Sequence, residues 1–299
     1  MSRSTKWFLV VLGILTLFTV GLTIIILSLA GPGQGRAITS GFGEKIGLVE
    51  IRGEITFSEN AVRQIKSYRE DGSIRALLLR IDSPGGGVAA SQEIYEEVRK
   101  TRESGKPVVV SMGAIAASGG YYIACGASRI VANRGTLTGS IGVISEFLQL
   151  SEALEKLGVS VTTIKAGALK DAGSPTKKMT VQDRAYFQEL MDEVHEQFIG
   201  VVASERGMSR DSVRPLADGS VMTGETAVKK GLIDTLGTFQ DAILITADLA
   251  GIDGEPSVVK ERVRRSFWDG FFGETEEAVV KAARELLERP VLSYRYVGP

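Results

Sequence analysis

Three short segments carry groups that could take part in acyl transfer. The first, Met112–Gly120, places one hydroxyl, Ser118, among alanines and glycines ahead of an apolar stretch. Small neighbours would let a substrate carbonyl reach that hydroxyl, and the N–H of Gly119 lies beside it, where an oxyanion donor usually stands. Taken alone, the segment fits a small residue in a packed helix start equally well.

The second segment, Asp82–Gly87, lies between an apolar run and a helical pattern. It lacks the Gly-Lys-Ser/Thr ending of a phosphate-binding loop and the Gly-x-Gly-x-x-Gly pattern of a dinucleotide loop. What remains is a row of backbone N–H groups, one of which could face a developing oxyanion. A plain tight turn is the competing interpretation.

The third segment, Lys165–Pro175, carries two lysines among small residues. A lysine acts as a general base only when it is neutral, and a free amine of pKa about 10.4 is neutral in about one molecule in 2,500 at pH 7. Burial and polar neighbours, for example Ser140, would lower that pKa. Composition does not separate Lys170 from Lys165, and a solvated loop charge is the alternative for both.

The composition of the chain excludes several functions. A net charge of −1 gives no indication of nucleic-acid binding. The single cysteine, Cys125, rules out an intrachain disulfide, and one Cys with one His cannot supply the four ligands of a structural zinc site. We therefore expect no structural zinc, and acyl transfer by a hydroxyl and an amine would imply no metal and no cofactor. The lone histidine, His195, falls in an amphipathic helical pattern and is interpreted as a helix-surface residue.

The N-terminus has the pattern of a membrane signal. The uncharged, mostly apolar run Trp7–Ala30 would form a helix of roughly 36 Å, enough to cross a hydrocarbon core. Arg3 and Lys6 precede it, so the positive-inside rule keeps the N-terminus in the cytoplasm and the bulk of the chain outside. A cleaved signal peptide is the alternative, although its apolar region is usually only about 7–15 residues. An anchor over residues 1–30 and a flexible linker over 31–44 are predicted.

Residues 45–253 alternate between apolar runs and helical patterns, which predicts an α/β domain whose parallel sheet is covered by helices. The predicted strands are Ile46–Ile51, Ala76–Ile81, Pro107–Ser111, Arg129–Ala132 and Val161–Lys165. The predicted helices span residues 59–69 with Ser58 as N-cap, 88–102, 118–127, 151–157, 180–205 and a last stretch that ends near 250.

Residues 254–299 form a separate C-terminal tail in the predicted domain organisation. Arginines alternate with Phe267, Trp268 and other aromatics over Glu261–Phe272, and Glu274–Glu288 is typical of a charged helix. The aromatic and basic stretch fits a membrane-interface or subunit contact. A helix packed on its own domain fits it equally well.

Together these motifs resemble the signal peptide peptidase A family of Ser/Lys-dyad serine peptidases, in its short bacterial form. The resemblance rests on Ala-Ser-Gly-Gly-Tyr-Tyr around Ser118, Thr-Gly-Ser-Ile-Gly-Val around Ser140 and Lys-Asp-x-Gly-Ser-Pro from Lys170, in this order. The N-terminal apolar run and the Ser-Pro-Gly-Gly-Gly loop also match. The resemblance therefore covers nearly the whole chain.

The resemblance implies a crotonase-like α/β fold shared with Clp-type peptidases. Ser118 would be the nucleophile, Lys170 the general base, and Ser140 would orient the lysine amine. Backbone N–H groups of Gly119 and of the Gly85–Gly86 turn would form the oxyanion hole. In this family short chains assemble into homo-oligomeric rings of about eight subunits, in which neighbouring copies can complete the dyad. Clp peptidases use Ser-His-Asp, so a Ser/Lys pair suits a chain whose only histidine lies on another helix.

The implied function is a single-pass endopeptidase of the bacterial inner membrane, with its catalytic domain on the outer side, that degrades residual signal peptides and other short apolar peptides. Three alternatives remain at this stage. The chain could be a related peptidase with one specific membrane-protein substrate, a non-catalytic ring scaffold, or a crotonase-fold acyl-CoA enzyme. The last would leave Ser118 and Lys170 without a role.

Overall fold

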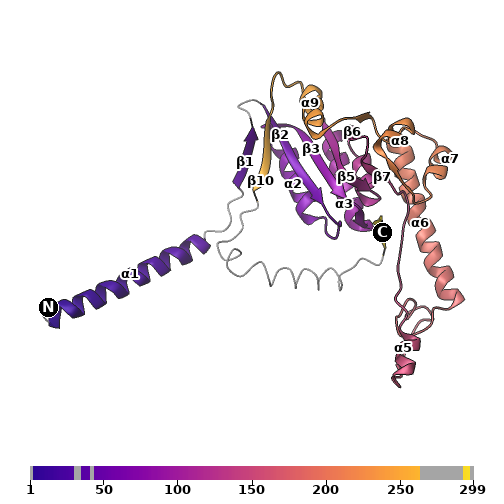
Figure 1. The fold of residues 1–299 in the computed structure, drawn as a ribbon, viewed down its shortest axis with the longest axis horizontal. Coiled ribbons are helices and arrows are strands. Elements are labelled where there is room, and N and C mark those ends of the chain that lie inside the picture. The colour runs from indigo at the N-terminus through magenta and orange to yellow at the C-terminus, as the bar shows by residue number, and fades with distance from the viewer. Residues whose placement is uncertain (1–2, 30–34, 41–43, 263–291, 297–299) are drawn as a thin grey trace.

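The computed structural model describes residues 3–29, 35–40, 44–262 and 292–296. Its main element is a nine-stranded sheet with the strand order β1-β10-β2-β3-β5-β6-β9, in which β7 also pairs with β5 and β8. Most of these pairs are parallel, and helices cover both faces of the sheet (Figure 1). The predicted α/β architecture with a largely parallel sheet and flanking helices is confirmed.

The described elements have the following bounds. The strands are β1 (Gly35–Ser40), β2 (Lys45–Arg52), β3 (Ile74–Ser83), β4 (Gly85–Gly87), β5 (Val108–Ala117), β6 (Arg129–Ala132), β7 (Leu137–Gly139), β8 (Val221–Thr223), β9 (Thr235–Leu236), β10 (Ser257–Arg262) and β11 (Ser293–Arg295). The helices are α1 (Arg3–Leu29), α2 (Glu59–Glu70), α3 (Val88–Glu103), α4 (Gly119–Cys125), α5 (Ser151–Lys156), α6 (Val181–Glu205), α7 (Arg210–Val213), α8 (Gly224–Lys229) and α9 (Phe239–Leu249), with a 3₁₀ turn, η1, at Arg214–Leu216.

The central strands are buried on both faces, which explains apolar runs such as Ala76–Leu79 in β3 and Val108–Val110 in β5. In β3, Leu77 and Leu79 pack in the core formed with α2, α3 and α4. Leu78, between them, packs in the second core beneath α9. Because successive side chains of a strand point to opposite faces, one apolar run serves both layers.

The carboxyl ends of β3, β5 and β7 meet at one edge of the sheet. β3 runs parallel to β5, and β5 runs parallel to β7. The segment after β3 holds Gly85–Gly87, while Ser118 and Ser140 directly follow β5 and β7. Parallel pairing therefore collects three of the sequence motifs at a single place.

One local prediction is wrong, and a second is confirmed in part. Val161–Lys165 is irregular and exposed, in a segment that extends away from the sheet beside α5 (Figure 1). Its β-branched residues favour a strand, but none of the strands in the described part of the chain pairs with it. Ser58 is the N-cap residue of α2 as expected, but its side chain makes no capping hydrogen bond and instead hydrogen-bonds Glu93.

The sheet extends past both predicted boundaries of the 45–253 domain. β10 lies in the predicted tail but pairs in parallel with β2, and β1 lies in the predicted linker but pairs antiparallel with β10. β10 covers the edge of β2, and β1 in turn covers β10, so neither strand leaves that row of backbone groups unpaired. Phe267, Trp268 and the predicted helix Glu274–Glu288 lie outside the described residues.

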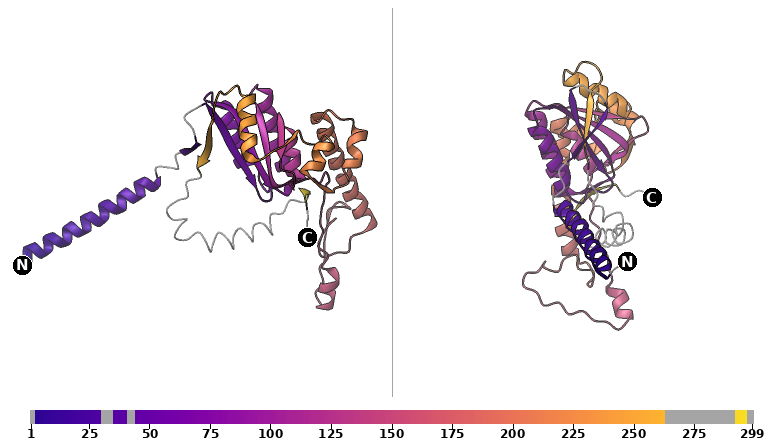
Figure 2. Two further views of the ribbon diagram at one scale, coloured as in Figure 1. Left: turned by 45° about the horizontal axis from the view of Figure 1, so that its top comes forward. Right: turned by 90° about the vertical axis from the view of Figure 1, so that its left-hand side faces the viewer.

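The N-terminal segment forms one helix, α1, which points away from the sheet in both views of Figure 2. Among the residues that the structure describes, none of the helices combines the length and apolarity needed to cross a membrane. The transmembrane anchor therefore stays a prediction.

Candidate active site

Ser118 occupies a sharp turn between β5 and α4. Its backbone has φ 54° and ψ −116°, a conformation that costs a non-glycine residue of order 1–3 kcal/mol. The turn is held because the Ser118 N–H donates to the Gly139 carbonyl at 2.8 Å and its own carbonyl accepts from the Tyr122 N–H at 2.8 Å. Ser118 is 1% exposed, and within the described residues its Oγ has no hydrogen-bond partner. A hydroxyl held this way resembles the nucleophile of a strand-turn-helix elbow.

Ser140 lies beside Ser118 and shares its unusual backbone. It is buried, has φ 50°, and its N–H donates to the Ser220 carbonyl at 2.8 Å. The register pairs Ala117 with Gly139, so the two serines follow directly paired residues of neighbouring strands. They are the two non-glycine residues with positive φ in the described part of the chain. Strain is therefore concentrated at two adjacent hydroxyls, a pattern typical of functional sites.

The glycine turn after β3 brings a backbone N–H to the same place. Gly85 has φ 101°, and its N–H donates to Ser83 Oγ at 3.1 Å. The N–H of Gly86 instead faces Gly119: a Cβ built on Gly119 would lie 3.2 Å from the Gly86 nitrogen. The turn thus presents Gly86, rather than Gly85, beside the residue that follows Ser118.

The chain's own C-terminal strand, β11, lies against this turn. Tyr294 pairs opposite Gly86 in an antiparallel register. Two residues to either side, Leu292 accepts from the Val88 N–H at 3.3 Å and Tyr296 donates to the Pro84 carbonyl at 2.7 Å. Since hydrogen-bonded pairs alternate along an antiparallel ladder, Tyr294 and Gly86 form a hydrogen-bonded pair, and the Tyr294 carbonyl faces the Gly86 N–H.

The other edge of β11 is paired as well. Ile144 and Ser293 exchange two backbone hydrogen bonds, with N···O distances of 3.0 and 3.1 Å. An extended peptide therefore fits between two backbones at this site. The Tyr294 carbonyl oxygen would lie 1.9 Å from a Cβ on Gly85, so this approach requires a glycine there, and it would be in tight contact, at 3.1 Å, with a Cβ on Gly119.

The Tyr294 side chain enters an aromatic pocket beneath the turn. Its ring is fully buried, stacks on Tyr122 at a centroid distance of 5.2 Å and contacts Phe198 at 4.7 Å. The hydroxyl donates to the Val194 carbonyl at 3.1 Å. Burial raises the pKa of the Tyr294 phenol well above its ordinary value. The pocket suits a large apolar side chain that carries one donor at its tip.

Lys170 differs from Ser118 and Ser140 in being exposed. It lies on an exposed turn, with its N–H donating to the Gly167 carbonyl at 3.2 Å. Its neighbours Leu169 and Ala172 line a cavity of about 550 Å³ that also contacts β11. The structure thus brings together Ser118, Ser140, Gly86 and Gly119, while no hydrogen bond joins Lys170 to the Ser118 hydroxyl.

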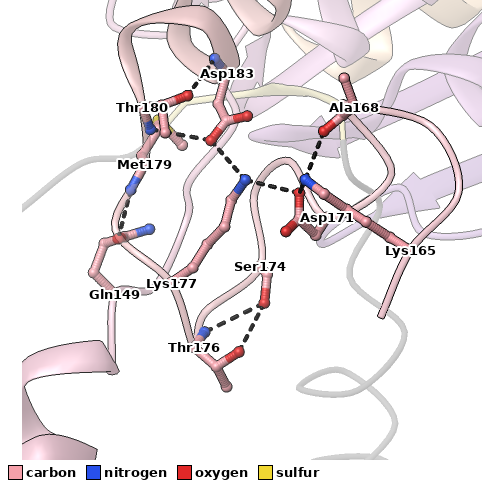
Figure 3. Close-up of polar contacts among 10 residues, drawn as sticks. All are labelled: Gln149, Lys165, Ala168, Asp171, Ser174, Thr176, Lys177, Met179, Thr180 and Asp183. Atoms are coloured by element: carbon pink, nitrogen blue, oxygen red, sulfur yellow. Dashed lines mark hydrogen bonds and ion pairs between the residues drawn. The ribbon is translucent and has the colours of Figure 1, made fainter. Parts of the chain in front are cut away.

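A network of charges fixes the turn that carries Lys170 (Figure 3). Asp171 accepts hydrogen bonds from Lys165 at 2.5 Å and from Lys177 at 2.8 Å, and these bonds lower the pKa of Asp171 to about 2. Lys177 also pairs with Asp183 at 3.0 Å, in the first turn of α6. Asp183 forms a capping box with Thr180 that starts this helix. The turn is thereby tied to the N-terminus of α6.

His195 has a local role in this arrangement. It lies on α6 as expected, half-buried, and its Nε2 is 3.3 Å from the Ile141 carbonyl oxygen. It makes no hydrogen bond to Ser118. Sequence reasoning missed Ser91, whose buried Oγ has no partner within the described residues and would lie 2.4 Å from a Cβ on Gly119. No local motif marks Ser91, because it lies inside an ordinary amphipathic helix.

Comparison with known proteins identifies the family of the chain. A model of Peptidase family S49 matches residues 100–253, a range that holds Ser118, Ser140 and Lys170. The chain is 44% identical over 211 residues to "Putative protease slr0021" of Synechocystis sp., covering 70% of this chain and 76% of that protein. It is 35% identical over 243 residues to "Protease 4" of Salmonella typhi, covering 79% of this chain and 38% of that longer protein.

The class of protein follows from the fold and these matches: an α/β serine endopeptidase. The chain belongs to peptidase family S49. A solved ClpP1 variant of Listeria monocytogenes is also similar, with a TM-score of 0.44 and 16% identity, covering 65% of this chain and 93% of that one. That similarity is too low to define the fold further.

Proposed function

We propose that this chain is a membrane-anchored endopeptidase in which Ser118 is the nucleophile, Lys170 the general base and Ser140 the residue that orients the lysine. The observation that carries the proposal is the pair of strained, adjacent serines, one of which has a buried hydroxyl without a partner among the described residues. Such strain persists only where surrounding structure enforces it, and it is concentrated at active sites.

The proposed reaction is acyl transfer. Neutral Lys170 takes the Ser118 proton as Oγ attacks the peptide carbonyl, and the N–H groups of Gly86 and Gly119 hold the oxyanion. The lysine then gives its proton to the leaving amine, which releases the first product. It next activates water, whose attack frees the serine and the second product.

We propose that the substrates are signal-peptide remnants and other short apolar peptides. β11 is an example of a bound extended strand, because it is paired on both edges and its Tyr294 ring is fully buried. Backbone pairing accepts many sequences, while an apolar pocket selects for hydrophobic side chains. Signal peptides supply such residues in quantity.

The exposed position of Lys170 supports a dyad shared between subunits. A base must lie within hydrogen-bond reach of its proton, yet the Ser118 Oγ has no partner in the described part of a single copy. In the proposed ring of about eight copies, the turn of one subunit reaches the serine of the next.

The Asp171 network gives a test of the base-bearing turn. Asp171→Asn removes the charge that holds Lys165 and Lys177, so the turn loosens and kcat is expected to fall about tenfold. Tm should stay unchanged, because these pairs lie outside the cores. Glu152→Gln, which breaks the exposed pair with Lys178 in the same segment, is the matched control and should leave kcat unchanged.

The same network predicts a pH dependence of the turn. The folded pKa of Asp171, about 2, is below its ordinary 3.8. Its ion pairs are therefore fully present above pH 4 and are lost as the pH falls through 2. Limited proteolysis should cut the 144–178 segment readily only when the pH falls from about 4 to about 2. Cleavage of this segment already near pH 6 would contradict the proposed role of Asp171 in holding the turn.

The anchor is tested by fractionation of the full chain. The proposal expects it to stay in the membrane pellet after an alkaline carbonate wash and to keep its intact mass. A deletion of residues 1–30 should be released. A soluble product that begins at Gly31 would instead support a cleaved signal peptide.

The function itself is tested with a panel of synthetic signal peptides, followed by mass spectrometry, using wild type and Ser118→Ala. Cleavage of most of the panel by wild type alone supports the proposal. If a single membrane protein is cut and the panel stays intact, the chain is the more specific peptidase. An inert wild type that still assembles would favour the scaffold.

A further inference from the structure

We infer that Glu54 and Glu146 form an acidic subsite that takes a basic side chain, Arg or Lys, directly after the bond that is cut. The inference deepens the proposed function and rests on its placement of the reacting carbonyl. It assigns a substrate preference to two residues outside the sequence motifs.

The geometry starts from the register of β11. The Tyr294 carbonyl faces Gly86 and lies close to Gly119, where the reacting carbonyl of a substrate is proposed to lie. Tyr294 therefore stands in for the residue before the cut, and Arg295 for the residue after it. The bound segment shows where each neighbouring side chain of a substrate would lie.

Arg295 is held by both carboxylates at once. Its Nη1 is 3.3 Å from Glu54 Oε1, and its Nη2 is 3.3 Å from Glu146 Oε2. The Arg295 side chain is only 18% exposed, although Glu54 and Glu146 are more open to solvent. The two glutamates come from separate loops, one after β2 and one after β7, and converge on this one guanidinium.

The surrounding cavity can hold a long side chain. It has a volume of about 550 Å³, and its walls include Phe147 and Tyr186. Ser293 and Arg295 both line it, whereas Tyr294 points into the aromatic pocket on the opposite side. Side chains of an extended strand alternate in this way. A substrate bound as a strand would therefore direct the side chain that follows the cut into the cavity, as Arg295 does.

The preferred substrates are thus peptides with a large apolar residue followed by a basic one. A substrate with Asp or Glu directly after the cut would place its carboxylate against the two glutamates, and repulsion between like charges would disfavour its binding. Because the glutamates are partly exposed, screening limits the preference to about five- to tenfold.

The test compares two peptides that differ only after a central tyrosine, Tyr-Arg and Tyr-Gln, with the full-length chain. The ratio of their kcat/KM values is the measurement, since occupancy of the site by β11 lowers both values equally. Wild type should favour Tyr-Arg five- to tenfold, and the double variant Glu54→Gln, Glu146→Gln should reduce the ratio to about one. Glu70→Gln, on distant α2, is the matched control and should keep the wild-type ratio.

Binding to the Ser118→Ala chain, measured by fluorescence anisotropy of the same peptides, separates this inference from the proposed function. The proposed function fails and the subsite stands if wild type cuts neither peptide, but Tyr-Arg binds more tightly than Tyr-Gln and this difference is lost when both glutamates are replaced by Gln. Equal kcat/KM values for the two peptides in wild type would overturn the inference. So would a preference for Tyr-Arg that survives in the double glutamine variant.

Discussion

Mixed assemblies of two inactive variants should recover about a quarter of wild-type activity. Ser118→Ala and Lys170→Ala are each expected to lose at least about 10³-fold in kcat, because nucleophile and base act as one unit. Co-expression at equal levels with two different tags, followed by sequential affinity steps, yields assemblies that contain both variants. Their cleavage of a signal peptide, normalised per site, is the measurement.

The physical reason is the exposed position of the Lys170 turn. If the base comes from a neighbour, a working site needs an intact serine from one copy and an intact lysine from the next. Random mixing in a head-to-tail ring produces that combination at about one site in four. The Ser118 Oγ, which is buried and has no hydrogen-bond partner in the described part of one copy, is consistent with a base that arrives on assembly.

Other locations of the general base predict different activities for these assemblies. A dyad formed within one chain leaves every site in the mixture defective, so activity would remain at background. Retained activity of Lys170→Ala alone would place the base elsewhere. Assemblies of Ser118→Ala copies only, purified in parallel, set the background.

The sequence predicted the sheet well because its strands are buried on both faces. β3 and β5 each contain a short apolar run, Ala76–Leu79 and Val108–Val110, and the glycine and serine motifs follow at the carboxyl ends of these strands. Once the strands are known to be parallel, their carboxyl ends must meet at the same edge of the sheet. The convergence of Ser118, Ser140 and the glycine turn could therefore be anticipated from short segments.

Other features depend on partners that are distant along the chain. β10 and β11 are short and lie in the predicted tail, and their pairing with β2 and the glycine turn has no local signal. The prediction for Val161–Lys165 failed in the opposite way, because its β-branched residues favour a strand but no strand among the described residues pairs with it. Glu54 and Glu146 are ordinary loop residues until β11 places Arg295 between them.

Gly86→Ala is expected to lower kcat by about 10²–10³-fold while the chain stays folded. A Cβ on Gly86 would lie 2.2 Å from the backbone oxygen of Ile55, which cannot move aside as a side chain would. The turn must therefore shift, and the Gly86 N–H leaves its position facing the reacting carbonyl. Loss of one oxyanion donor has effects of this size in other serine hydrolases.

Gly72→Ala is the matched control, because a Cβ at Gly72 would meet nothing within 4 Å. Both variants should keep wild-type far-UV circular dichroism, and only Gly86→Ala should lose kcat in the signal-peptide assay. Binding of a peptide to Gly86→Ala should also weaken, since Gly86 pairs with the strand that occupies the site. A Gly86→Ala chain with kcat within threefold of wild type would remove Gly86 from the oxyanion hole, and with it the register by which Tyr294 and Arg295 mark the two sides of the cut.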